Sequence, residues 1–205
     1  MQERPYVFLD FEFTMPENKT TPRGFFPEII EVGLVVVAGN EVCEQFSSYV
    51  KPTSFPVLTE RCKSFLKITQ AQIDEGISLA ELVERLKQYD ALRPTVITWG
   101  SMDMKVLKHN CARSNLPFPF TGEQRDLAME YKMFFGERNQ PGLRQAVQEY
   151  GKEGVGKPHC ALDDAFTTYN IFKLVEKDKT YLARPSQPTL GERIDFSQLL
   201  KKFAL

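Results

Sequence analysis

Tyr-Val-Phe-Leu-Asp-Phe-Glu-Phe, residues 6–13, is the stretch of this 205-residue chain that decides the fold. Its aromatic and apolar residues predict a β-strand that carries two carboxylates. Side chains two positions apart on a strand point the same way, so Asp10 and Glu12 share one face. The other face carries Val7, Leu9, Phe11 and Phe13. Neighbouring carboxylates in an apolar setting repel each other unless a cation lies between them. The run therefore predicts either a divalent-metal site or an edge strand with a solvated polar face.

The segments that follow this strand predict an α/β domain. Apolar runs at 29–38 and 42–50, separated by Gly39-Asn40, indicate two more strands in an antiparallel meander. Helical spacing begins near Thr59 and ends before Pro94, and a short strand is expected at 95–98. Further helices are expected at 103–113, 126–135, 143–150 and 160–175. Strands followed by a strand set among helices predict a mixed sheet flanked by helices.

Composition indicates a globular protein of the cytoplasm. The chain is 42% apolar with a formal charge of −1, so no bulk positive field attracts nucleic acid or an anionic membrane, and a phosphate-rich partner would need a local site. Its longest apolar stretch is too short for a membrane helix, and the acids within residues 5–13 are untypical of a signal peptide. The four cysteines are widely spaced, which predicts reduced thiols. We therefore expect a cytoplasmic location and no membrane.

The chain is expected to form one domain with an appendage. Residues 1–177 would be the domain, and residues 178–205 a proline-containing linker and a C-terminal amphipathic helix. The apolar positions of that helix are Ile194, Phe196, Leu199, Leu200 and Phe203. We expect it to dock on its own domain or to hold a protein partner.

Two further segments carry groups that could join the first two carboxylates. Asp103 follows a predicted strand and begins a helix, where α/β proteins place ligands, although aspartate also caps helices. His159 precedes the last long helix, and histidine readily takes a proton near neutral pH. Asp163 and Asp164 follow it, and helical spacing does not choose between them; acids also suit a helix's first turn through its dipole.

Two other patterns have simpler interpretations. The other histidine, His109, lies among Lys105, Lys108 and Arg113, which is typical of a solvated basic helix face. Residues 151–157 have the spacing of a phosphate-binding P-loop, but Pro158 stands where that motif needs serine or threonine, and a helix is predicted before it. We expect a loop that carries His159.

The three motifs, taken in order, resemble a known family. Asp10-x-Glu12, Asp103 and His159-x-Ala161-x-x-Asp164 match the exonuclease motifs of the DEDDh superfamily of 3′–5′ exonucleases. Residues 27–33 and 46–52 resemble strands of its Eri-like branch, which includes the histone-mRNA 3′ exonuclease and predicted exonucleases that inhibit a sporulation kinase pathway. The resemblance covers about residues 5–176.

The resemblance implies a ribonuclease H-like fold with a mixed five-stranded sheet, and it implies roles for individual residues. Two Mg²⁺ or Mn²⁺ ions would be held by Asp10, Glu12, Asp103 and Asp164. His159 would be the general base, and Asp163 would lie on the helix surface. Residues expected to line the terminal nucleotide are Phe11, Phe13, Thr14 and Met102. Met102 replaces an aromatic residue that is frequent in the family, which removes a stacking group at that position.

The function expected from these features is metal-dependent 3′–5′ removal of mononucleotides from single-stranded RNA or DNA ends. One alternative is a regulatory protein that keeps the exonuclease fold and acts by binding a partner, as in inhibition of a sporulation kinase pathway. A second is a nucleic-acid binder without turnover. The presence of all five motif residues favours the enzyme.

Overall fold

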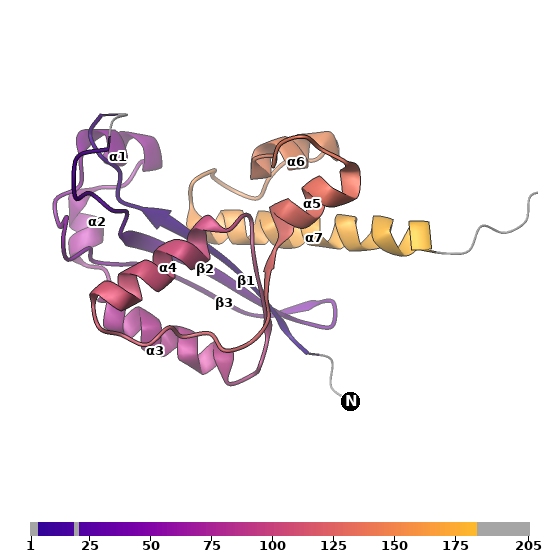
Figure 1. Ribbon diagram of the computed structural model, residues 1–205, viewed down its shortest axis with the longest axis horizontal. Helices are drawn as coiled ribbons and strands as arrows, with labels where there is room; N and C mark the ends of the chain where they lie inside the picture. The colour runs from indigo at the N-terminus through magenta and orange to yellow at the C-terminus, as the bar shows by residue number, and fades with distance from the viewer. Residues whose placement is uncertain (1–3, 19–20, 184–205) are drawn as a thin grey trace, which may run out of the picture. The chain divides into compact units, whose positions relative to one another are not determined.

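The computed structural model describes residues 4–18 and 21–183, and its centre is one five-stranded sheet (Figure 1). The strands are β1 (Tyr6–Phe13), β2 (Ile29–Ala38), β3 (Glu41–Tyr49), β4 (Thr95–Thr98) and β5 (Gln124–Asp126). They lie in the order β3-β2-β1-β4-β5. The mixed five-stranded sheet expected from the resemblance is confirmed, and β1 is its central strand.

Pairing around β1 combines both strand directions. β2 pairs with β1 and β3 in antiparallel fashion, which confirms the meander, whereas β4 runs parallel to β1. Opposite Asp10 on β2 stands Gly33, and opposite Glu12 stands Glu31. The register shifts between Glu12 and Phe13, as at a β-bulge. A bulge re-aims side chains where pairing ends, here beside the two carboxylates.

Seven helices accompany the sheet in the described part of the chain. They are α1 (Glu60–Leu66), α2 (Gln70–Asp74), α3 (Leu79–Asp90), α4 (Met102–Arg113), α5 (Leu127–Phe135), α6 (Leu143–Glu149) and α7 (Ala161–Ala183). Local sequence explains several of their starts. Ser78 and Glu81 form a capping box at α3, and Thr69 and Gln72 form another at α2.

The two faces of β1 pack against different helices. Val7, Leu9 and Phe11 belong to the main core. This core also takes in Leu82, Val83 and Leu86 of α3, and Val106 and Leu107 of α4. On the opposite face the Phe8 ring lies 5.1 Å from Tyr169 and 5.3 Å from Phe172, both of α7. The alternation predicted for residues 6–13 is therefore observed, with the carboxylates on the α7 face.

The structure differs from the sequence expectations at two places. Strand β5, three residues long, lies in a segment where the sequence indicated no strand, because three residues carry too little periodicity. Helix α7 continues to Ala183, past residue 175, where the sequence-based helix was expected to end. By contacts the chain divides into residues 1–172 and 173–205, and the helix expected at 194–203 lies outside the described residues. No helix in the described part combines the length and apolarity that crossing a bilayer requires.

Candidate active site

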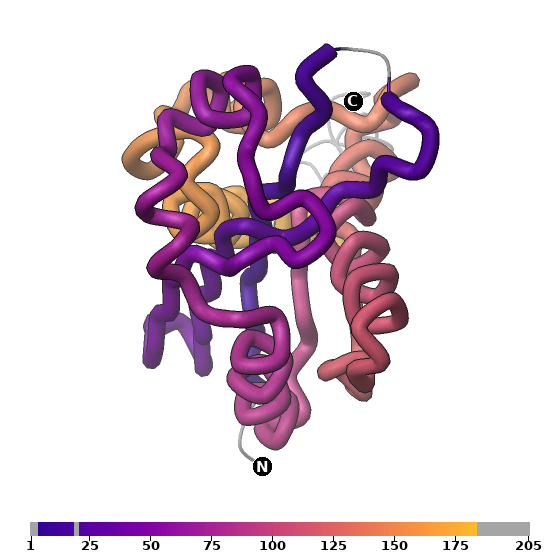
Figure 2. The backbone as a smooth tube through the Cα atoms, turned by 90° about the vertical axis from the view of Figure 1, so that its left-hand side faces the viewer, coloured from indigo at the N-terminus to yellow at the C-terminus, as the bar shows by residue number. Residues whose placement is uncertain are grey.

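Four carboxylates and one histidine from three parts of the chain meet where β1 ends. Asp10 and Glu12 come from β1, Asp103 from the first turn of α4, and Asp164 from the first turn of α7. The charges of the other three carboxylates raise the pKa of Asp10. The side-chain oxygen or nitrogen atoms of Glu12, His159 and Asp164 that could bind a metal lie within 4.8 Å of one another. The structure thus brings together all five residues predicted from the motifs. Figure 2 shows residues 14–18 and 21–28 and helices α1 and α2 at this end of the sheet, away from the start of β1.

Burial raises the pKa values of these carboxylates. It raises the pKa of Asp10 well above its ordinary value, and the charges of Asp103 and Glu12 raise it further. Glu12 is 8% exposed, and burial followed by the charge of Asp164 raises its pKa from 4.5 to about 8. The pKa of Asp164 is also raised, mainly by burial, against hydrogen bonding from His159 that lowers it. Without a counter-charge, the cluster costs free energy at neutral pH.

Asp103 links α4 to the central strand. It is 4% exposed, and its Oδ1 accepts a hydrogen bond of 3.0 Å from the backbone N–H of Phe11. Burial raises the pKa of Asp103 to about 7, although the bond from Phe11 lowers it. Ser101, not Asp103, is the N-cap residue of α4, so the helix-cap interpretation of Asp103 is wrong. The carboxylate instead lies between strand and helix, beside the other acids.

His159 has a strained backbone next to the cluster. Its φ is 61°, in the left-handed region that non-glycine residues rarely adopt. Its backbone N–H donates to Asp164 Oδ2 at 3.0 Å, and its Nδ1 lies 4.0 Å from Glu12 Oε1. The Phe65 ring of α1 lies 4.4 Å from the imidazole. The hydrogen bond fixes the main chain of His159, and the contact with Phe65 holds its imidazole beside Glu12.

The two aspartates that helical spacing left open have different positions. Asp164 belongs to the acidic cluster, whereas Asp163 Oδ2 accepts a hydrogen bond of 2.7 Å from the backbone N–H of Lys157. Asp163 therefore ties the preceding loop to α7, and Asp164 faces the other carboxylates.

Glu31 and Gly33 of β2 contact the start of α7 and position it. The sequence analysis assigned a role to neither residue. Glu31 is 5% exposed, and its Oε1 accepts a 3.2 Å hydrogen bond from the backbone N–H of Ala161. A Cβ at Gly33 would overlap the main chain of Ala161, so glycine allows the close approach. The sequence signal that could have identified Glu31 is its charge, which stands out within the otherwise apolar, buried run of β2. Through Ala161, these two residues position His159 and Asp164.

Residues predicted to contact the terminal nucleotide have unequal exposure. The Phe11 side chain is 3% exposed and belongs to the core, so its ring is not accessible for stacking on a base. Phe13 is partly buried, and the buried Thr14 accepts a hydrogen bond from the Glu28 N–H. Met102 is 54% exposed at the start of α4. Phe65, which the sequence did not single out, is 49% exposed beside His159.

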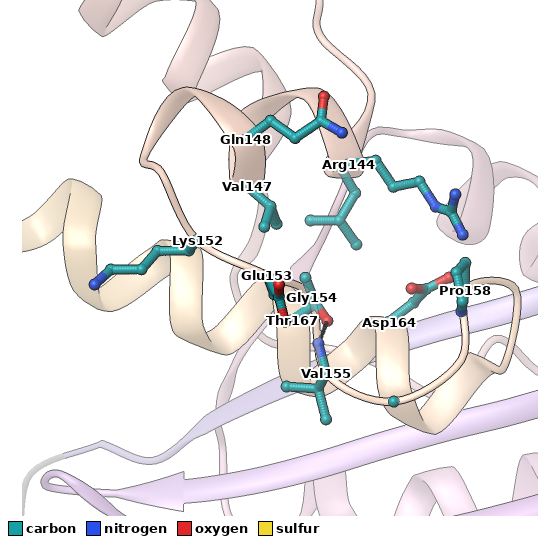
Figure 3. Close-up of a pocket in the computed structure, with 12 residues that line it drawn as sticks. Arg144, Val147, Gln148, Lys152, Glu153, Gly154, Val155, Pro158, Asp164 and Thr167 are labelled. Carbon is teal, nitrogen blue, oxygen red and sulfur yellow. Dashed lines mark hydrogen bonds between the residues drawn. The ribbon is translucent and has the colours of Figure 1, made fainter.

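A cavity of about 340 Å³ adjoins Asp164 between α6, the 151–158 loop and the start of α7 (Figure 3). Asp164 and Arg144 lie toward one end of it, and Arg144 lowers the Asp164 pKa. The Val155 N–H donates to Thr167 Oγ1 at 2.9 Å, which fixes the loop to α7. The segment with P-loop spacing follows helix α6, as expected, so it lacks the strand that a P-loop requires.

The donor set fits a divalent cation. In the described part of the chain, no lysine or arginine forms an ion pair with any of the four carboxylates. Mutually repelling carboxylate oxygens that no lysine or arginine pairs with are the ligands that hard cations such as Mg²⁺ prefer. An imidazole beside such a centre is placed to accept a proton.

Comparison with known proteins agrees with this geometry. Residues 7–172 match the family model RNase_T, described as exonuclease. The chain is 56% identical over 203 residues to the probable 3′-5′ exonuclease KapD of Bacillus subtilis, covering 98% of this chain and 99% of that protein. It is 30% identical over 169 residues to human 3′-5′ exoribonuclease 1, covering 77% of this chain and about half (48%) of that protein.

A solved structure extends the likeness to the fold. The nuclease domain of 3′hExo, described as a DEDDh family member bound to rAMP, superimposes with a TM-score of 0.76 and 28% identity over 85% of this chain and 92% of that one. The DEDDh family implies a divalent metal, which agrees with the acidic cluster of Glu12, His159 and Asp164. With the matched family model and the near full-length similarity, these findings show that the chain belongs to the RNase T exonuclease family, as a DEDDh 3′–5′ exonuclease.

Proposed function

We propose that this exonuclease uses two Mg²⁺ or Mn²⁺ ions to release nucleoside monophosphates from the 3′ ends of single-stranded RNA or DNA. The observation that carries the proposal is the group of four carboxylates, two buried (Glu12 and Asp103) and two partly buried, with raised pKa values and no lysine or arginine in an ion pair with them in the described residues. Solved relatives include a 3′-exonuclease that recognises the 3′ end of a histone mRNA stem-loop, which supports action at a strand's end.

Each of the four carboxylates would hold metal. The ligands would be Asp10, Glu12, Asp103 and Asp164. When bound, such ions activate water and stabilise the charge on attacking and leaving oxygens of a phosphodiester. The Phe11 N–H fixes the Asp103 carboxylate, and the His159 N–H fixes that of Asp164, so the ligand oxygens are held in place before metal arrives.

His159 would act as general base. Its imidazole takes a proton from the attacking water as oxygen adds to phosphorus and the bond from phosphorus to the 3′ oxygen breaks. The departing 3′ oxygen takes up a proton from solvent, so the products are a nucleoside 5′-monophosphate and a strand with a new 3′-hydroxyl, and His159 returns its proton to solvent. Contact with Phe65 and the Asp164 hydrogen bond support this role, because they keep the ring next to the carboxylates.

Exposed side chains beside the cluster would receive the terminal nucleotide. Phe65 and Met102 offer half-exposed apolar surface, which suits stacking and packing on any base. Phe13 and Thr14 follow Glu12 directly and would line the same nucleotide, with Phe11 contributing only its main chain. Such contacts are tolerant of sequence, so we expect activity on strands of mixed composition.

The test is degradation of 5′-labelled single strands with Mg²⁺, with Mn²⁺ and with chelator. We expect a metal-dependent ladder that shortens from the 3′ end and disappears in Asp10→Asn and His159→Ala, while the surface variant Glu84→Gln on α3 retains it. No shortening by folded wild-type protein with either metal would refute the proposal. That outcome would favour a regulatory protein acting through residues 178–205.

A cytoplasmic setting belongs to the same proposal. All four cysteines are unpaired, as reducing conditions would leave them.

A further inference from the structure

The exposed face of α4 carries cations and no acid. Lys105, Lys108, His109 and Arg113 all lie on the exposed side of this helix, and the helix's single acid, Asp103, is buried in the active site. We call these four residues the α4 basic face. Helix α3, of the same length, instead mixes signs and pairs Lys87 with Glu84 at 2.6 Å. A one-sign face on a chain of net charge −1 is a local concentration of positive charge.

Protein acids do not neutralise this face. In the described residues, no salt bridge involves Lys105, Lys108 or Arg113. The Arg113 guanidinium instead lies 4.0 Å from the centre of the Phe26 ring. A bound polyanion could therefore supply the negative charge that balances the α4 basic face.

Partly exposed aromatic rings continue the basic face. The Phe26 ring lies 5.2 Å from His109 and 5.3 Å from Phe55, and Phe55 lies 4.9 Å from Phe25. All three phenylalanines are intermediate in exposure. Rings interleaved with cations favour a ligand that offers both flat aromatic groups and negative charge.

Buried polar side chains hold this surface rigid. Asn110 of α4 accepts a hydrogen bond of 2.9 Å from the Ile29 N–H and donates one of 2.9 Å to the Pro27 carbonyl, which fixes the segment that carries Phe26. The Glu28 carboxylate accepts hydrogen bonds from the backbone N–H groups of residues 53–55, which fixes Phe55. A surface ordered before a ligand arrives loses less entropy on binding.

The surface begins at the active site. Asp103 lies in the first turn of the helix whose exposed face carries the cations, and the rise from Asp103 to Arg113 is about 15 Å at helical spacing. A second connection is a cavity of about 290 Å³, whose lining runs from Thr14, two residues beyond Glu12, to Phe25 and Phe55. A chain anchored by its end at the carboxylates can therefore continue across this surface.

We propose that the α4 basic face and the ring of Phe26 bind the part of a single-stranded nucleic acid that lies upstream of the scissile bond. The inference rests on the proposed function and adds the path of the strand away from the site. Lysines and Arg113 contact phosphates, and Phe26 stacks on a base. A duplex is disfavoured because its bases are paired and stacked inside, where the rings do not reach them.

Binding of a fluorescent oligouridylate, followed by anisotropy in chelator over a range of salt, tests the inference without cleavage. The variant Lys105→Glu/Lys108→Glu is compared with Arg4→Glu/Arg93→Glu, which makes the same change of net charge where β1 and β4 begin. Log affinity falls as log salt rises, and losing two phosphate contacts makes this negative slope shallower by about 1.4. The same loss weakens binding about 25-fold at about 0.1 M salt. The control pair is expected to keep the wild-type slope.

Two further variants separate charge from stacking and from misfolding. Lys105→Gln/Lys108→Gln removes the charge without reversing it and is expected to lower the slope in the same way. Phe26→Ala is expected to weaken binding about fivefold or more with the slope unchanged, because stacking releases no counterions. Equal slopes for wild type and the lysine variants, an equal loss in the control pair, or a duplex that competes as well as the single strand would each overturn the inference.

Turnover with Mn²⁺ distinguishes failure of this inference from failure of the proposed function. If wild-type protein shortens no strand, the proposed function fails while the binding data still decide the role of the α4 basic face. If the wild type degrades long strands in preference to trinucleotides, the lysine variants are expected to lose that preference. Retention of the full preference would contradict the inference and leave the exonuclease mechanism intact.

Discussion

Replacing Glu12 by glutamine is expected to flatten the pH dependence of stability of the metal-free protein. The Glu12 side chain is 10% exposed, and its pKa rises from 4.5 to about 8, first because of burial and then because of Asp164, Glu31 and Asp103. The folded protein thus holds the Glu12 proton more tightly than the unfolded chain does. Stability from this group is complete below the unfolded pKa and is lost as the pH rises through the folded one.

The magnitude follows from the two pKa values. Between them the free energy of unfolding falls by about 1.4 kcal/mol per pH unit, so Glu12 alone removes about 3 kcal/mol between about pH 6 and about pH 9. Asp103, with a folded pKa of about 7, removes further stability in the lower part of this window. In Glu12→Gln the loss from Glu12 is absent, and the charge of Glu12 no longer raises the pKa of Asp10, so the variant is expected to lose at least about 3 kcal/mol less than the wild type.

Urea denaturation in chelator, at both ends of that pH range, measures the difference. Glu81→Gln is the control, because hydrogen bonds from Ser78 lower the Glu81 pKa and keep this exposed group ionised throughout the range. It is expected to follow the wild-type pH dependence. Equal losses in wild type and Glu12→Gln would refute the argument that burial and neighbouring acids hold the Glu12 proton. Adding Mn²⁺ is expected to stabilise the wild type more at the higher pH, where the carboxylates are free of protons.

Substitutions at three further positions, Glu31, Gly33 and His159, test how the site is positioned. Glu31→Ala is expected to lower kcat about tenfold or more with little change in KM. Glu31→Gln is expected to keep part of the kcat that Glu31→Ala loses, because an amide oxygen still accepts a hydrogen bond from the Ala161 N–H. Equal effects of the two variants in steady-state kinetics would contradict a positioning role for Glu31. Gly33→Ala is expected to cost about 3 kcal/mol or more and lower Tm, since its Cβ would overlap main chain, whereas Gly142→Ala, with open space around it, should not. His159→Asn, compatible with a φ of 61°, is expected to lose about 10²- to 10⁴-fold in rate while calorimetry still detects Mn²⁺ binding; normal turnover would exclude His159 as the base.

Much of the fold was predictable because the local signals are strong. Residues 6–13 and 29–38 have the strand bounds expected from their apolar runs, and the short strand at 95–98 lies where it was predicted. Strand β5 was missed because it has three residues and gains its place by pairing with β4. A strand of that length is specified by its neighbour and not by its own pattern.

The candidate site divides in the same way. The order and spacing of the three motifs single out Asp10, Glu12, Asp103, His159 and Asp164 without any coordinates. The sequence did not reveal the part played by Glu31, because its contact is with the Ala161 N–H, 130 positions away in the chain. It also placed Phe11 at the nucleotide, whereas burial of its ring leaves only the main chain for that role.

The α4 basic face shows most clearly what each level determines. The sequence by itself determined that Lys105, Lys108, His109 and Arg113 share one side of a helix, because helical periodicity is a local property. Only the tertiary structure decided that no acid pairs with the three cations in the described residues, that Phe26 lies against Arg113, and that Asn110 fixes this arrangement. Those contacts join segments more than 80 positions apart, and packing of the whole sheet and its helices is what brings such segments together.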